Sequence, residues 1–235
     1  MTPLPTPAEI AARLARPRAV RARGDVATAT ALLAQGGLHP YDAERFGPLP
    51  SSSIPYPQGA GAPGARVKRI PAAVLMLLLG RPEGLSVLFT RRTPELKRHA
   101  GQIAFPGGRL EPGDADVVAC ALRETEEEIG LPRHTVSVLG RLDPYLTITG
   151  YEVTPVVGTA APPSAFAPDP TEVAEIFEVP LAFLLDPANH RRERRIVDGL
   201  TRAYYAVPYG ERYIWGATAG MILNLYDVLS ASAPG

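Results

Sequence analysis

Three glutamates near the middle of the chain have the spacing of a metal site. In the segment RETEEEIGL, which spans residues 123–131, Glu124 is followed by Glu127 and Glu128. On a helix, positions three and four residues apart share one face, so the three carboxylates gather within about 100° of arc. Such like charges repel one another unless a cation lies between them. Carboxylate oxygens are the ligands that Mg²⁺ prefers in proteins.

A run of glutamates on a helix is most often only a solvated surface. Three neighbouring features favour a site instead. Arg123 can orient a carboxylate by a charge-assisted hydrogen bond. Gly130 and Pro132 end the helix, so the acids occupy its last turn. Upstream, the FPGG segment at residues 105–108 is a backbone that can approach a ligand closely.

The elements that must hold this helix are predicted from apolar periodicity. The acid-bearing helix itself is expected over residues 116–129. Strands are expected at 74–79, 86–92, 136–145, 153–159, 173–179, 194–197 and 203–207, and further helices at 181–185 and 218–229. Strands before and after a central helix, closed by a final helix, predict an α/β (α+β) fold with a mixed sheet between helices.

The first 70 residues have a different character from the rest. Helices are predicted at 7–16 and 26–34, followed by a Pro/Gly/Ser-rich stretch at 48–64. This stretch contains a G-x-G-x-x-G pattern, but neither a strand before it nor a helix after it supports a dinucleotide site. The chain is therefore divided into an N-terminal extension at 1–70 and a catalytic domain at 71–232.

Composition narrows the class of protein. The 235 residues carry 24 basic and 24 acidic side chains, so no bulk positive charge is available to hold nucleic acid. One cysteine excludes an internal disulfide framework. The longest apolar run, at 72–79, is too short to span a bilayer, and the N-terminus lacks the apolar core of a signal peptide. A cytoplasmic protein with no membrane or nucleic-acid partner is expected; the oligomeric state stays open.

The segment at 108–131 resembles the box of the Nudix hydrolases, written G-x5-E-x7-R-E-U-x-E-E-x-G-U, where U is a bulky apolar residue. Its second half is matched by Arg123, Glu124, Glu127, Glu128, Gly130 and Leu131. Thr125 stands where U is usual. In the first half there is one residue too many, and Asp114 and Asp116 flank the place of the early glutamate. The resemblance implies a Nudix-type α/β/α sandwich.

The stretch just before the box resembles the signature of coenzyme A pyrophosphatases, L-L-T-x-R-S-A-…-R-x3-G-x3-F-P-G-G. Thr90, Arg92, Gly101 and the FPGG segment match it. Lys97 stands where the signature has arginine, which keeps the charge but loses the bidentate fork. The likeness extends over roughly residues 74–225.

This resemblance implies a set of site residues. The metal, Mg²⁺ or alternatively Mn²⁺, would be held by the three box glutamates and the carbonyl of Gly108. Arg123 would hold a ligand carboxylate in place. Glu172 is favoured as general base, with Glu175 and the box glutamates as alternatives. The cations expected to contact substrate phosphates are Arg92, Lys97 and Arg98. The basic run at 191–195 is either a solvated surface or a contact to the ribose 3′-phosphate.

The activity implied is Mg²⁺-dependent hydrolysis of coenzyme A, or of acyl-coenzyme A, to 3′,5′-ADP and 4′-phosphopantetheine. Two alternatives stay open. The same chemistry can act on ADP-ribose, NADH or a dinucleoside polyphosphate. A Nudix scaffold can also serve as a nucleotide-sensing module without activity, although such proteins usually lack the box glutamates that are present here.

Overall fold

The protein is represented by a computed structural model that describes residues 4–17, 19, 23–46, 69–96, 99–163, 165–197 and 200–231. Within these ranges a nine-stranded mixed sheet forms the centre of the molecule. Its strands are β1 (Arg23–Gly24), β3 (Ile70–Arg81), β4 (Gly84–Arg92), β5 (Ile103–Ala104), β6 (Gly107–Arg109), β7 (Ser137–Arg141), β8 (Tyr145–Leu146), β9 (Tyr151–Ala160) and β10 (Val173–Pro180). The main path runs β1-β8-β9-β3-β4-β10, with β3 and β9 parallel.

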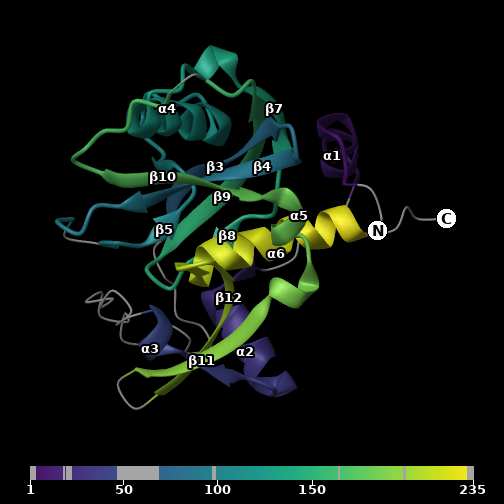
Figure 1. The fold of residues 1–235 in the computed structure, drawn as a ribbon, viewed down its shortest axis with the longest axis vertical. Coiled ribbons are helices and arrows are strands. Elements are labelled where there is room, and N and C mark those ends of the chain that lie inside the picture. Colours follow the sequence, from purple (N-terminus) through teal and green to yellow (C-terminus); the bar gives the residue numbers. More distant parts are fainter. Residues whose placement is uncertain are drawn as a thin grey trace.

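Helices cover both faces of this sheet. Helix α4 (Val117–Ile129) packs on one face, and α6 (Gly216–Ser230) runs along the other (Figure 1). A smaller sheet, in the order β13-β12-β11-β2, lies beyond α6. The remaining elements are α1 (Pro7–Leu14), α2 (Asp25–Gln35), β2 (His39–Pro40), α3 (Ala43–Phe46), α5 (Leu181–Leu184), β11 (Arg191–Val197), β12 (Leu200–Tyr209) and β13 (Arg212–Trp215), with 3₁₀ turns at Arg133–Thr135 and Pro187–Asn189.

Strand β3 explains why the sheet needs a helix on each side. Its apolar run does not alternate with polar residues, which is typical of a strand buried on both faces. Leu75, Leu77 and Leu79 pack in the cluster that contains α4, whereas Met76 and Leu78 pack in the cluster that contains α6. The expected α/β fold with a mixed sheet between helices is therefore confirmed.

The prediction of one strand over 136–145 is wrong. The structure has β7 ending at Arg141 and a separate β8 starting at Tyr145. The pairing of β7 with β9 shifts register between Val138 and Gly140, and such a bulge bends the strand. Pro144 then lacks the N–H that a continuous ladder needs. Strand β13 was not predicted, because four residues before a helix carry little periodic signal.

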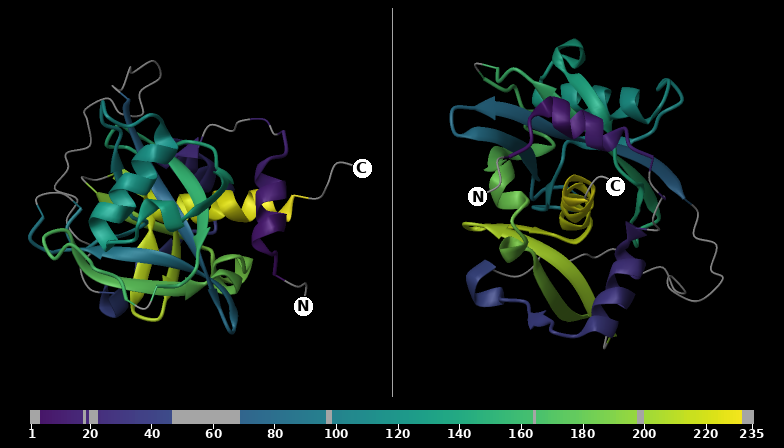
Figure 2. Two further views of the ribbon diagram at one scale, coloured as in Figure 1. Left: turned by 90° about the horizontal axis from the view of Figure 1, so that it is seen from above. Right: turned by 90° about the vertical axis from the view of Figure 1, so that its right-hand side faces the viewer.

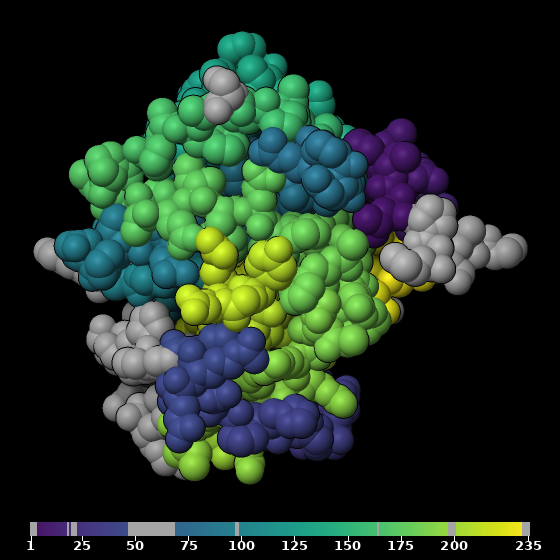
Figure 3. Space-filling model, viewed as in Figure 1, coloured from purple at the N-terminus to yellow at the C-terminus, as the bar shows by residue number. Residues whose placement is uncertain are grey.

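The N-terminal extension is built into both sheets. Strand β1 pairs with β8, and β2 pairs with β11. Helix α1 crosses beside the C-terminal half of α6 and buries Ile10 and Leu14 in the main core (Figure 2). Figure 3 shows the α3 region packed directly on the C-terminal strands. The Pro/Gly/Ser-rich stretch at 48–64 lies outside the described residues. Within the part that is described, no helix is long and apolar enough to cross a membrane.

Candidate active site

The helix that carries the glutamates begins and ends close to where the sequence predicts. The side chain of Asp116 caps its start by accepting hydrogen bonds from the N–H groups of Val118 (2.8 Å) and Ala119 (2.9 Å). Gly130 ends it in the left-handed conformation, with φ of 70°. Thr125, the polar residue at the usually apolar box position, is buried, and its hydroxyl donates to the Ala121 carbonyl at 2.6 Å. The threonine is therefore tolerated without an unsatisfied group.

The three glutamates differ in their exposure to solvent. The exposed fractions of their side chains are 18% for Glu124, 57% for Glu127 and 6% for Glu128. The carboxylate of Glu124 lies against the backbone of Gly108 on β6, so closely that a Cβ atom on Gly108 would be 2.3 Å from its Cδ. The N–H of Gly107 donates to the carboxylate of Glu128. Strand β6 thus brings the FPGG backbone onto the acid-bearing face of α4.

Arg123 is the centre of an ion-pair network. Its guanidinium contacts Glu124 at 3.0 Å and Glu127 at 2.9 Å, and it donates to the Arg109 carbonyl at 3.2 Å. It also forms a bidentate pair with Asp114, at 2.9 and 3.0 Å. These hydrogen bonds lower the pKa of Asp114 to about 2. Arg123 therefore contacts two of the three box carboxylates and is itself held by Asp114; that it positions metal ligands stays a prediction.

Sequence reasoning did not assign this role to Asp114. The signal was present, because Asp114 lies beside the place where the Nudix box has its early glutamate. Its side chain is only 4% exposed, and it also accepts from the N–H of Glu111 at 2.8 Å. The loop with one extra residue therefore still delivers an acid to Arg123.

An Asp114→Asn variant is expected to lower turnover about 10- to 100-fold, the usual cost of removing a group that orients a metal ligand. Asparagine cannot accept two charge-assisted hydrogen bonds from Arg123, so the guanidinium no longer holds Glu124 and Glu127 in place. The loss of turnover is measured from the steady-state rate at which product forms. The matched control is Glu126→Gln on the same helix, since Glu126 pairs with Arg133 at 2.6 Å and not with Arg123. Equal turnover in the two variants would contradict the positioning role.

The same variant makes a prediction for stability against pH. The pKa of Asp114 is lower in the folded protein than its ordinary value of 3.8. The unfolded chain therefore binds more protons between these two values, and the stabilisation by Asp114 is complete above about pH 4 and lost as the pH falls toward 2. The difference in urea midpoint between wild type and Asp114→Asn should accordingly shrink from pH 5 to pH 2.5. A constant difference would show that Arg123 does not lower the pKa of Asp114.

Arg92 connects the acid-bearing helix with a second acidic residue. One guanidinium nitrogen lies 3.8 Å from Glu128, and another lies 3.9 Å from Glu172. The register of β4 with β10 explains this arrangement, since Arg92 is opposite Val173, the residue after Glu172. Burial raises the pKa of Glu128 to about 8, and the charge of Arg92 opposes that rise. Glu172 is near enough to raise the pKa of Glu128 further.

The other candidates from the sequence lie in several places. Glu175, the alternative base, is bound by Arg91 of the neighbouring strand β4 at 3.2 Å and by Arg212 of β13, in the smaller sheet, at 3.0 Å. Lys97 and Arg98 lie outside the described residues. Within the basic run of β11, Arg195 lines a cavity, whereas Arg191, Arg192 and Arg194 are exposed.

The donor set beside α4 fits a hard cation. Carboxylate oxygens of Glu124 and Glu128 and the backbone of Gly108 are oxygen donors, which suit Mg²⁺ or Mn²⁺. A Cβ atom on Gly108 would have to displace the carboxylate of Glu124. In the described part of the chain, no three His, Cys, Asp or Glu side chains already converge as a preformed cage. The assignment of metal ligands stays a prediction.

Cys120 belongs to the packing of α4. It is fully buried, and its Sγ lies 3.2 Å from the Arg109 carbonyl and 3.7 Å from that of Gly108. Burial raises the pKa of its thiol to about 11. A thiol that stays protonated is a poor nucleophile and a poor ligand for Mg²⁺. Cys120 is therefore a small packing residue of α4.

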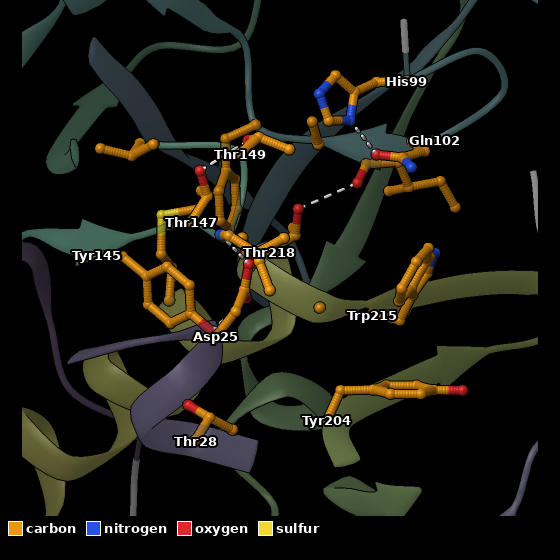
Figure 4. A pocket seen from close by; sticks show the side chains of 18 of the residues that line it. Asp25, Thr28, His99, Gln102, Tyr145, Thr147, Thr149, Tyr204, Trp215 and Thr218 are labelled. Atoms are coloured by element: carbon orange, nitrogen blue, oxygen red, sulfur yellow. Dashed lines mark hydrogen bonds between the residues drawn. The ribbon is translucent and has the colours of Figure 1, made fainter. Parts of the chain in front are cut away.

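A cavity of about 560 Å³ opens beside Arg92 and Gly107. Figure 4 shows Trp215 and Tyr204 on one side of it and Asp25 and Tyr145 on the other. Asp25 comes from the start of α2, so the N-terminal extension completes the cavity. No pattern in the sequence placed Asp25, Tyr204 and Trp215 together around one cavity.

Comparison with known proteins identifies relatives along most of the chain. A family model described as NUDIX domain matches residues 69–200. A protein of Escherichia coli (strain SMS-3-5 / SECEC), named Uncharacterized Nudix hydrolase NudL, is 42% identical over 154 residues, which are 66% of this chain and 80% of the relative. A protein of the same name from Yersinia pestis (strain Pestoides F) is 40% identical over 159 residues, 68% of this chain and 79% of the relative. Among solved structures, a Nudix hydrolase from M. Smegmatis, RenU, is 27% identical, with a TM-score of 0.39 over 49% of this chain and 73% of that chain.

Proposed function

This chain belongs to the Nudix hydrolase family, and from that premise we propose that it hydrolyses the diphosphate bond of coenzyme A and of acyl-coenzyme A. Membership of the family indicates the general activity, hydrolysis of nucleoside diphosphate derivatives, but not the particular substrate. The choice of coenzyme A rests on the signature at residues 88–108. We further propose a cytoplasmic location and a small-molecule substrate, as expected from composition.

The observation that supports the proposal is that a residue of the coenzyme A pyrophosphatase signature lies beside the acid-bearing helix α4. Arg92, a signature residue, lies between Glu128 and Glu172 and also lines the cavity. The other described signature residues build the loop that places it. Phe105 stacks on Phe89 with ring centroids 4.8 Å apart, and Gly101 has the φ of 67° that its turn requires. A substrate diphosphate beside Arg92 would therefore reach both the glutamates and the cavity.

The chain supplies the groups that the reaction needs. A bound Mg²⁺ or Mn²⁺ would offset the charge of the diphosphate and make a water molecule more acidic. Arg92 would contact a phosphate oxygen, and Arg123 would hold the ligand carboxylates. Glu172 is our candidate base, because its half-exposed carboxylate lies beside Arg92. It would accept the proton as water forms a bond to phosphorus and the bridging P–O bond breaks, which releases 3′,5′-ADP and 4′-phosphopantetheine.

Product analysis tests this proposal. The protein is incubated with Mg²⁺, and in parallel with Mn²⁺, and with coenzyme A, 3′-dephospho-coenzyme A, ADP-ribose or NADH. We expect 3′,5′-ADP from coenzyme A as the fastest reaction. Faster cleavage of ADP-ribose or NADH would support hydrolysis of a diphosphate bond but contradict coenzyme A as the preferred substrate. No cleavage of any substrate with either metal would reject the enzymatic proposal in favour of a sensing module.

A further inference from the structure

The small sheet presents two arginines and two aromatic residues to the cavity. Arg195 on β11 pairs in register with Arg202 on β12, so both side chains leave the sheet on the same face. Tyr204 lies two residues after Arg202 and therefore shares that face. Trp215 on β13 is opposite Ala206 and shares it too. We call Arg195, Arg202, Tyr204 and Trp215 the cationic–aromatic wall; all four line the cavity.

The members of this wall are in contact with one another. The guanidinium of Arg195 lies 4.8 Å from the ring centroid of Trp215, as in a cation–π pair. The rings of Tyr204 and Trp215 meet edge to face, with centroids 5.4 Å apart. Tyr204 is held by Tyr213, because the two hydroxyl oxygens lie 3.2 Å apart and the Tyr213 hydroxyl donates to the carboxylate of Glu193 at 2.5 Å. These contacts give the wall a defined shape before any ligand arrives.

Charge is unevenly distributed around the cavity. Among the described residues that line it, the arginines are Arg92 near the glutamates and Arg195 and Arg202 in the wall, and the acidic residue is Asp25. Asp25 accepts hydrogen bonds from the Tyr145 hydroxyl at 2.9 Å and from the Ile148 N–H at 2.7 Å, on the side away from Trp215. The cavity therefore offers cations at two separate places, one beside the glutamates and one at the wall.

Two separate cationic places suit a ligand with two separate anionic groups. An arginine fork matches a phosphate, and aromatic rings bind the flat face of a nucleobase. We propose that the cationic–aromatic wall binds the 3′-phosphate and adenine of the substrate, while Arg92, together with a divalent cation that the glutamates would hold, binds its diphosphate. This inference rests on the proposed function and assigns a place in the structure to the 3′-phosphate. Within the basic run of β11, it selects Arg195 over its neighbours.

Trp215 provides a direct test, because it is the only tryptophan in the chain. Its fluorescence is titrated with adenosine 3′,5′-bisphosphate and, separately, with AMP, which lacks the 3′-phosphate. We expect both nucleotides to change the emission and the bisphosphate to bind about 10- to 100-fold more tightly, the effect of a few charge-assisted hydrogen bonds. No change of emission with either nucleotide, or equal affinity for the two, would overturn the assignment.

Arginine variants show whether the wall causes this preference. In Arg202→Gln and in Arg195→Gln, the preference for the bisphosphate should fall to less than about threefold, while the affinity for AMP stays near that of the wild type. Arg194→Gln is the matched control, since Arg194 is exposed and pairs with Ala203 rather than with the wall. Two variants of the wall are used because one of them could be too unstable to give a binding constant, and the other then still tests the preference. A preference kept in both would overturn the proposal.

Turnover separates failure of the wall from failure of the proposed function. If the wall acts as proposed, Arg195→Gln raises KM for coenzyme A and leaves KM for 3′-dephospho-coenzyme A unchanged. If the wild type cleaves coenzyme A but both KM values change equally in the variant, the wall does not bind the 3′-phosphate, whereas the proposed hydrolysis of coenzyme A is supported. If the wild type cleaves neither substrate, the function fails, and the titration alone decides whether the wall binds the bisphosphate.

Discussion

A Glu124→Gln variant is expected to lose about 10²- to 10³-fold or more of its kcat, the scale on which charge stabilisation at a reaction centre is lost. Glu124 lies against Gly108 and is held by Arg123 at 3.0 Å, so its carboxylate has a defined position beside the signature loop. Glutamine nearly preserves the shape but removes the charge that a divalent cation requires. The variant should therefore bind Mg²⁺ and Mn²⁺ more weakly than the wild type does.

Three measurements together identify the cause of such a loss. Product release gives kcat, calorimetric titration gives the affinity for Mn²⁺, and circular dichroism gives the melting temperature. We expect kcat and the affinity for Mn²⁺ to fall, and the melting temperature to stay within a few degrees of the wild-type value. Glu126→Gln, on the same helix but paired with Arg133, should match the wild type in all three. Near-normal turnover in Glu124→Gln would remove Glu124 from the metal site.

Changing either of two adjacent glycines to alanine is expected to damage a different property: the substitution at Gly107 should lower stability, and the one at Gly108 should lower turnover. At Gly107, with φ of 153°, a Cβ atom would lie 2.3 Å from the Ala73 carbonyl oxygen and 2.6 Å from the Cα of Val74. Both are backbone atoms of the central strand β3 and cannot move aside cheaply. Strain together with overpacking should cost about 2 to 6 kcal/mol of unfolding free energy. The melting temperature of Gly107→Ala should fall by roughly 5 to 20 °C.

At Gly108 the atoms in the way belong to the carboxylate of Glu124, at 2.3 to 2.4 Å. The end of a glutamate side chain can swing away, so Gly108→Ala should melt near the wild-type temperature. The displaced carboxylate should lower turnover about 10- to 100-fold, as other disturbances of metal-ligand orientation do. Thermal melts and kinetics of the two variants side by side test this division. A strongly destabilised Gly108→Ala variant, or a Gly107→Ala variant with unchanged melting, would contradict it.

The acid-bearing helix shows how far local sequence reaches. Its face of glutamates and its stop at Gly130 were predicted from neighbouring residues alone, and the structure has the helix at Val117–Ile129 with Gly130 directly after it. The two-sided burial of β3 is likewise encoded in an unbroken apolar run. The failure over 136–145 came from a bulge and a proline, which interrupt a strand without changing its apolar content.

The sequence by itself determined that Glu124, Glu127 and Glu128 share one helix, and it located the long strands β3, β4, β9 and β10 of the central sheet, because helical and strand periodicities are local properties. Only the tertiary structure decided what surrounds those acids. The approach of Glu172 to Arg92 follows from the register of β4 with β10, and the partnership of Asp114 with Arg123 follows from the path of a loop. The cavity joins the N-terminal Asp25 to the C-terminal Trp215, which lie 190 positions apart in the sequence. Contacts of this kind depend on how whole elements pack, and no spacing within one element records them.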